Sequence, residues 1–260
     1  MDTKKQDLEN VKLVLFYFFS ESKFEATASV DCISTLQLTS PQTLLYPCFP
    51  LRNIEEMVVP DNLSEDEKRL LKTLQIEEDE INQIEGEARD QAESHKWREE
   101  RKFRFTASTF HLISKRQKNH KNFAETLINP KYLEHGKKFV SVALRECEKL
   151  ICNRRTPVKV LPSGFIVSKD TPVIGATPDA RVVDFGCTDH FGIAEVKCPY
   201  SKHHVTPLDA CSDSQFFMEK TSDKKCKLKV GHPYYAQVQG QMAVTGARWC
   251  DFIVFTSRDL

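Results

Sequence analysis

Residues 192–200, GIAEVKCPY, have the short, β-rich character of a strand that ends at a proline. On such a strand Glu195 and Lys197 lie two residues apart and share one face, while Val196 points to the other face and packs in a core. A second acidic residue, Asp179 of the motif TPDA, lies sixteen positions earlier. A hairpin between the two motifs would bring Asp179 beside Glu195.

Asp179 and Glu195 would then form a pair of carboxylates that repel each other, which raises a pKa or demands a cation. Hard oxygen ligands suit Mg²⁺ or Mn²⁺. A metal ion there would polarise a phosphate oxygen and lower the pKa of a bound water, and Lys197 would orient that water or stabilise the developing charge. The alternative is an ordinary cross-strand ion pair of Lys197 with Asp179 or Glu195, and these three residues alone favour that alternative.

The segments around this strand predict a mixed α/β fold. The expected elements are a helix, three strands, a helix and a strand, at 131–151, 158–167, 180–185, 192–198, 233–245 and 249–256. The polar, Lys-rich stretch 199–232 is predicted to be a long excursion from this core.

The first third of the chain has a different character. Residues 61–100 predict one long solvated helix, because Ser64 and Glu67 form a capping box and apolar residues recur at helical spacing. We therefore divide the chain into a mostly helical extension, 1–95, whose role the sequence does not indicate, and a core, 96–260.

Charge restricts where this chain can contact nucleic acid. The 260 residues carry 37 basic and 37 acidic side chains, so such a contact requires a local basic patch. Residues 96–121 contain nine Lys and Arg against two acids, with aromatic residues interleaved. Basic side chains bind a phosphate backbone by releasing its counterions. The charge alone fits a phosphate-binding segment and a solvated helix face equally well.

The nine cysteines are odd in number and irregularly spaced, which predicts reduced thiols in an intracellular protein rather than a disulfide framework. No stretch approaches the roughly 20 apolar residues that a membrane-spanning helix requires. A DNA substrate would favour the nucleus or a viral setting.

Five segments occur in one order at suitable distances: WREERKFRFTAS from Trp97, Gly136, TPDA, AEVKCPY and YYAQVQGQM from Tyr234. Together they resemble the YqaJ-type viral recombinase family, which is similar to the exonuclease of phage lambda and belongs to the PD-(D/E)XK nucleases. The resemblance covers residues 96–256. It implies a restriction-endonuclease-like α/β core with a mixed central sheet flanked by helices.

The resemblance also implies roles for the residues of the two motifs. Asp179, Glu195 and the backbone carbonyl of Val196 are expected to bind Mg²⁺, for which Mn²⁺ can substitute. Lys197 is the expected catalytic lysine. Gln237 is similar to the family's active-site glutamine, which holds the lysine or the attacking water.

The resemblance also implies a role for the basic segment, residues 96–121. Arg101 and Ser108 match the family's basic residue and serine that hold a phosphate near the cleaved end, and Lys102 and Arg104 of the same segment are also expected to bind DNA phosphates. The implied substrate is double-stranded DNA degraded from a free end at a two-metal site, and the phage relatives imply a ring-shaped trimer.

Three departures from the family pattern bear on activity. The family's glutamate in the first core helix aligns with Val140, which cannot bind a metal. The family's Pro-Asp-Gly is Pro178-Asp179-Ala180 here, and the sequence ends at Leu260, where the family's last strand and helix are expected. The leading hypothesis is a metal-dependent DNA nuclease. The alternatives are a DNA-binding module without efficient cleavage and an interaction protein that works through residues 1–95.

Overall fold

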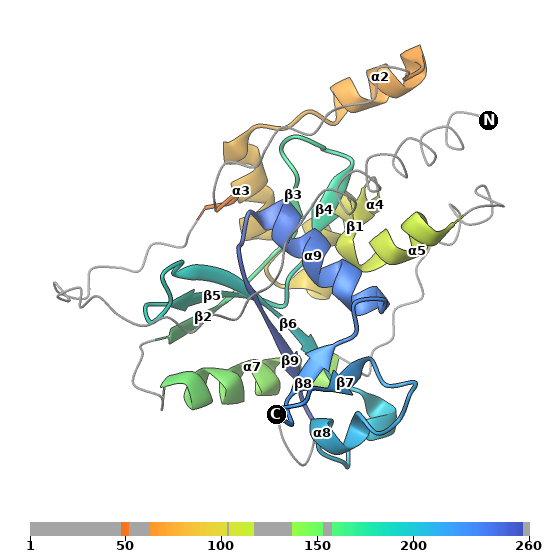
Figure 1. Cartoon of the computed structure of the whole chain (residues 1–260). Helices are drawn as coiled ribbons and strands as arrows, with labels where there is room; N and C mark the ends of the chain where they lie inside the picture. The colour runs from red at the N-terminus through yellow and green to blue at the C-terminus, as the bar shows by residue number, and fades with distance from the viewer. Residues whose placement is uncertain (1–47, 52–62, 103, 117–136, 153–157, 257–260) are drawn as a thin grey trace, which may run out of the picture.

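The computed structural model describes residues 48–51, 63–102, 104–116, 137–152 and 158–256 (Figure 1). Predictions about Gly136, the first residues of the helix expected at 131–151 and the end of the chain lie outside the described residues. Among the described helices, none combines the length and the apolar character needed to cross a lipid bilayer.

The central sheet has four strands in the order β2-β5-β6-β9. β2 (Val158–Pro162), β5 (Ala180–Asp184) and β6 (Phe191–Lys197) are antiparallel neighbours, and β9 (Cys250–Val254) pairs in parallel with β6. A parallel pair requires a long crossover, which here contains α9 (Pro233–Thr245). The sheet is therefore mixed, as the sequence predicts.

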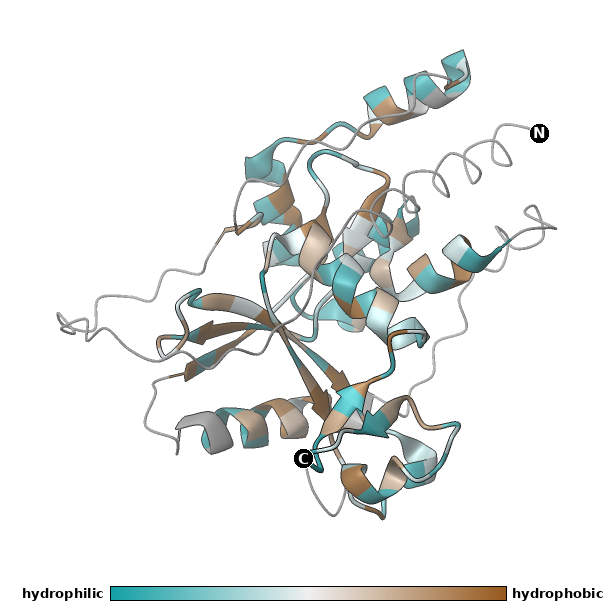
Figure 2. Ribbon diagram, viewed as in Figure 1, coloured by the Kyte–Doolittle hydropathy of each residue, from teal (hydrophilic) through white to brown (hydrophobic). Residues whose placement is uncertain are grey.

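Two helices flank this sheet, and strand alternation decides which side chains each one meets. α7 (Lys137–Cys152) packs against the face that carries Ala194 and Val196, whereas α9 contacts Ile193 on the opposite face. The strands are coloured mainly as hydrophobic in Figure 2, as expected for a sheet covered on both sides. Glu195 and Lys197 lie two and four residues after Ile193 on β6, so their side chains point to the same face as Ile193, which is the face that α9 covers.

A second sheet extends the core toward the N-terminal helices. It contains β1 (Phe105–Thr106), β4 (Ile174–Ala176) and β3 (Ile166–Val167) in that order, with β1 and β4 parallel. The expected strand at 158–167 is thus two strands in different sheets, and β4 was not predicted. Both differences arise because β3 and β4 are only two and three residues long, which is too short for a periodic pattern.

The prediction of a single helix over residues 61–100 is wrong. The chain forms α2 (Glu65–Thr73), α3 (Glu78–Glu87), a 3₁₀ turn η1 (Gln91–Glu93) and α4 (His95–Lys102). The breaks let one core take up apolar side chains from α3, from α4 and from the breaks themselves: Ile76, Ile81, Ile84, Ala88 and Trp97. The predicted start is confirmed, since the amide of Lys68 donates to the Ser64 carbonyl at 3.0 Å.

The start and end of α9 follow the signals in its sequence. His232 accepts a hydrogen bond from the Tyr234 amide, Pro233 occupies the first turn, and Gly246 ends the helix in the left-handed region at φ 72°. The predicted helix at 233–245 is therefore confirmed.

The excursion between β6 and α9 has its own small core. It contains α8 (Pro207–Ala210) and a hairpin of β7 (Met218–Lys220) and β8 (Cys226–Leu228), which the sequence reading did not predict. Phe216 and Phe217 are buried there, and their cluster includes Val254 of β9. The excursion is thereby attached to the end of the central sheet (Figure 1).

Candidate active site

Asp179 stands just before β5 and is fixed against β6 by two hydrogen bonds. Its amide donates to the Ala194 carbonyl at 3.0 Å, and its carboxylate Oδ2 accepts from the Val196 amide at 2.7 Å. Successive residues of a strand direct their main-chain groups to alternate sides. The Lys197 carbonyl accepts from Phe255 on the β9 side, so the Val196 carbonyl points to the side where Asp179 lies.

Glu195 is buried, and both of its carboxylate oxygens have protein partners. Gln237 Nε2 donates to Oε1 at 2.6 Å, and Gln241 Nε2 donates to Oε2 at 2.7 Å. Lys197 Nζ forms an ion pair with Oε1 and also donates to Gln237 Oε1 at 3.3 Å. The two glutamines are four residues apart on α9, so they project from one face of the helix onto the carboxylate.

Lys197 is held as a cation. Burial acts to lower the pKa of its ammonium, but the charges of Glu195 and Asp179 and the hydrogen bond to Glu195 outweigh burial and raise the pKa above its ordinary value. Its Nζ also lies 4.4 Å from the centre of the Tyr234 ring. The lysine therefore carries a fixed positive charge beside the two carboxylates.

Asp179 lies in the opposite electrostatic situation. Burial and the charge of Glu195 raise its pKa to about 8, although the Val196 amide and Lys197 act to lower it. Near neutral pH this carboxyl therefore holds a proton unless a cation compensates its charge.

Two carboxylates and one main-chain carbonyl form an all-oxygen donor set suited to a single Mg²⁺ or Mn²⁺. Within the part of the chain that the structure describes, no group of three or more His, Cys, Asp or Glu side chains is placed to hold a metal. Asp179, Glu195 and the Val196 carbonyl would therefore leave ligand positions to water or phosphate, as Mg²⁺ commonly requires.

Val140, which aligns with the family's glutamate, lies on α7 and packs against the apolar cluster of Ala143, Val182 and Val196. The nearby Glu146 forms an ion pair with Lys149 at 2.8 Å on the outside of the helix. Neither residue adds a third carboxylate to Asp179 and Glu195.

Arg101 lies next to the turn that precedes Asp179. Its guanidinium stacks 4.1 Å from the centre of the Trp97 ring, and NH1 donates to the Thr177 hydroxyl at 3.4 Å. Trp97 Nε1 donates to the same hydroxyl at 3.1 Å, and the Thr177 carbonyl accepts from Gln241 at 3.2 Å. The basic segment and α9 thus meet at Thr177, two residues before the carboxylate.

The other three residues of the predicted phosphate site differ in their surroundings. Ser108 is exposed in the 3₁₀ turn Ala107–Thr109, with its hydroxyl 3.0 Å from that of Thr106. Lys102 is exposed and pairs with Glu99 at 2.6 Å. Arg104 is mostly buried, pairs with Glu100 and donates to the Pro172 carbonyl at 2.8 Å, so its guanidinium is engaged within the fold.

Sequence reasoning did not select Gln241 or Thr177. Gln241 follows Gln237 by one helical turn, so the helical period could have suggested it. Thr177 lies within the TPDA motif, but its contacts with Trp97 and Arg101 depend on residues about 80 positions away, as part of a tertiary arrangement.

A sequence model of the YqaJ-like viral recombinase domain matches residues 96–248, more than half of the chain. Among solved structures, the chain is similar to an alkaline exonuclease (LHK-Exo) from Laribacter hongkongensis, with 22% identity and a TM-score of 0.43, covering 64% of this chain and 75% of that one. It is also similar to the Shutoff and Exonuclease Protein from Kaposis Sarcoma Associated Herpesvirus, with 19% identity and a TM-score of 0.32, covering 49% and 28%. No curated protein matches the sequence. The family match confirms the predicted family, and the mixed sheet between α7 and α9 confirms the predicted mixed α/β architecture.

Proposed function

The chain belongs to the family of YqaJ-like viral recombinase domains, and from this premise we propose that it is a metal-dependent deoxyribonuclease. Its reaction is hydrolysis of DNA phosphodiester bonds, exonucleolytic on linear double-stranded DNA. The observation that carries this proposal is the pair of Asp179 and Glu195 beside the cationic Lys197, where burial and the charge of Glu195 raise the pKa of Asp179 to about 8.

Each polar residue of the site has a part in this reaction. Asp179, Glu195 and the Val196 carbonyl hold Mg²⁺ or Mn²⁺, which when bound polarises the scissile phosphate and acidifies a water. Lys197 places a positive charge where negative charge develops during attack. Gln237 and Gln241 hold Glu195, and Gln237 also fixes the Lys197 ammonium.

Substrate binding is assigned to the basic segment. Arg101 and Ser108 are proposed to bind a phosphate of the strand end, because Arg101 lies beside the Thr177 turn that leads into Asp179. Lys102 adds an exposed charge on the same helix. Arg104 keeps the segment in place through Glu100 and Pro172. The trimeric ring, the requirement for a free end and an intracellular location are predictions of the same proposal.

The test is release of nucleotides from linear double-stranded DNA by the whole chain with Mg²⁺, Mn²⁺ or EDTA. Release is expected with either metal and lost with EDTA. Glu195→Ala should abolish it, because the substitution removes a metal ligand and the partner of Lys197. Release of nucleotides at the natural rate by a well-folded Glu195→Ala variant would refute the assigned site.

The second candidate function is a DNA-binding module without efficient cleavage. The position of Val140 favours it, since that residue packs in the core and, among the residues that the structure describes, α7 adds no carboxylate to Asp179 and Glu195. This candidate predicts metal-independent binding of duplex DNA and no nucleotide release under any of the three conditions.

A further inference from the structure

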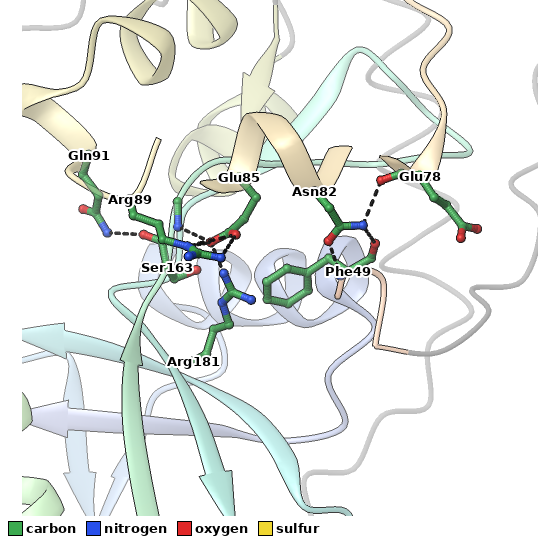
Figure 3. Close-up of polar contacts among 9 residues, drawn as sticks. Phe49, Glu78, Asn82, Glu85, Arg89, Gln91, Ser163 and Arg181 are labelled. Atoms are coloured by element: carbon green, nitrogen blue, oxygen red, sulfur yellow. Dashed lines mark hydrogen bonds and ion pairs between the residues drawn. The ribbon is translucent and has the colours of Figure 1, made fainter. Parts of the chain in front are cut away.

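A buried cluster of charged and polar side chains connects α3 and η1 to the central sheet (Figure 3). Glu85 lies at its centre with 1% of its surface exposed. Its carboxylate pairs with Arg181 of β5, accepts from Arg89 at 2.9 Å and accepts from the Gly164 amide at 2.8 Å. One carboxylate thus ties the helix to two segments of the core.

The packing at Gly164 fixes how closely α3 approaches. A Cβ atom on Gly164 would lie 1.9 Å from the Glu85 carbonyl oxygen, so only glycine leaves room for the helix. Backbone therefore meets backbone at this point, and the end of α3 has little freedom to shift relative to the β2–β3 connection.

Gln91 extends this attachment to the turn that carries Asp179. Its side-chain Nε2 donates to the Ser163 carbonyl at 3.1 Å and to the Pro178 carbonyl at 3.2 Å. The residue has φ 48°, a left-handed conformation that is unfavourable for a side chain other than glycine. Such strain persists where the surrounding structure imposes it, and it is frequent at functional sites.

The two attachments lie on either side of the acidic residue. Gln91 holds Pro178, directly before Asp179, and Glu85 holds Arg181, two residues after it. We infer that Gln91 is a positioning residue for Asp179, and that α3 and η1 complete the catalytic core although they precede the residues matched by the family. This inference rests on the proposed nuclease function.

Two substitutions separate positioning from stability. Gln91→Gly removes both side-chain hydrogen bonds but relieves the strained φ, whereas Gln91→Ala removes the bonds and keeps the strain. Ser94→Ala is the matched control in the same segment, because the Ser94 hydroxyl donates to the Glu87 carbonyl at 2.8 Å and accepts from the Trp97 amide at 3.2 Å, and the substitution keeps the backbone hydrogen bonds.

The experiment measures kcat and KM for linear duplex DNA, Mn²⁺ affinity by calorimetry, and Tm, all with the whole chain. Both Gln91 variants are expected to lose about tenfold or more in kcat, because small displacements of a catalytic group are costly. They should bind Mn²⁺ several-fold more weakly, with KM for DNA little changed. Gln91→Gly should keep a Tm closer to that of the natural chain than Gln91→Ala does, and Ser94→Ala should lower Tm while keeping kcat.

A natural kcat and Mn²⁺ affinity in a folded Gln91→Gly variant would overturn the inference, as would a kcat that follows Tm across all three variants. Failure of the natural chain to cut DNA would refute the proposed function instead. In that case Mn²⁺ binding still decides the positioning role: weaker binding by Gln91→Gly supports it, and equal binding overturns it.

Discussion

Two groups of charged side chains meet β5 within three residues of each other, and they differ in how their charges are balanced. At Arg181, the Glu85 carboxylate is shared by two guanidinium groups and a backbone amide. At Asp179, two carboxylates face one another with a single ammonium nearby, and the pKa of Asp179 rises to about 8. In the first group the single carboxylate is fully compensated by its cationic and amide partners, so we call this group complete, and it holds the backbone. The second is incomplete and suited to accept a cation.

The largest expected effect concerns the incomplete group. Lys197→Ala removes the cation that pairs with Glu195, so charge that develops at the phosphate loses its stabilisation. The rate of nucleotide release should fall by about 10²–10³-fold or more. Lys202→Ala is the control, because this lysine pairs with Asp213 at 2.7 Å outside the site. A natural rate of nucleotide release by the Lys197→Ala variant would mean that Lys197 only forms an ion pair and takes no part in cleavage.

A substitution in the complete group, around Glu85, should lower the stability of the fold. Glu85→Ala leaves the Arg181 guanidinium, 2% exposed, without its carboxylate, and the free energy of unfolding should fall by about 3–5 kcal/mol. Glu78→Ala is the control on the same helix, since its pair with Lys169 is solvated and should contribute no more than about 1 kcal/mol. Urea unfolding measures both. Equal losses would show that burial does not distinguish the two ion pairs.

The pH dependence of stability tests the raised pKa of Asp179, which burial and the charge of Glu195 cause. The pKa of Asp179 is about 8 in the folded chain, against an ordinary value of 3.8. Between these values the folded state holds a proton that the unfolded state has lost. The stabilisation is therefore complete below the lower value and is lost as the pH rises through the upper one.

Thermal unfolding of the metal-free chain from pH 5 to pH 9 measures this effect. The natural chain should lose stability as the pH rises, and Asp179→Asn should lose less over the same range. Asp251, whose pKa burial and Asp184 raise to about 6, contributes a similar slope to both proteins and cancels in their difference. Parallel curves for the two proteins would show that Asp179 has no raised pKa.

Local sequence patterns were sufficient for the elements that carry the chemistry. Alternation places Glu195 and Lys197 on one face of β6, and the signals at Pro233 and Gly246 delimit α9, which brings Gln237 onto that face. The antiparallel pairing of β5 and β6 places Asp179 beside Glu195, as the predicted hairpin requires. Each of these features depends on residues that are near in sequence or on one strand pairing.

The features that sequence reasoning missed depend on contacts between distant segments. Gln91 reaches Pro178 across 87 positions, and no local pattern indicates a glutamine in the left-handed region. The helix is interrupted between α2 and α3, and the core that this interruption serves is completed by strands about 90 residues later. Whether a basic residue of this segment is exposed or buried likewise depends on tertiary contacts, because Lys102 is exposed whereas Arg104 donates to the Pro172 carbonyl 68 positions away.

The smallest expected effect extends the comparison to these two basic residues. Lys102→Ala should weaken binding of duplex DNA a few-fold and reduce the slope of log affinity against log salt concentration by about 1, because one phosphate contact is lost. Arg104→Ala should leave that slope unchanged and lower the free energy of unfolding by about 1–3 kcal/mol, because the buried Pro172 carbonyl loses its donor. Salt titrations of affinity and urea unfolding of both variants separate the two effects. If Arg104→Ala changed the salt slope and Lys102→Ala did not, the buried charge would be the one that binds DNA. Burial would then no longer distinguish structural from substrate-binding charges in this segment.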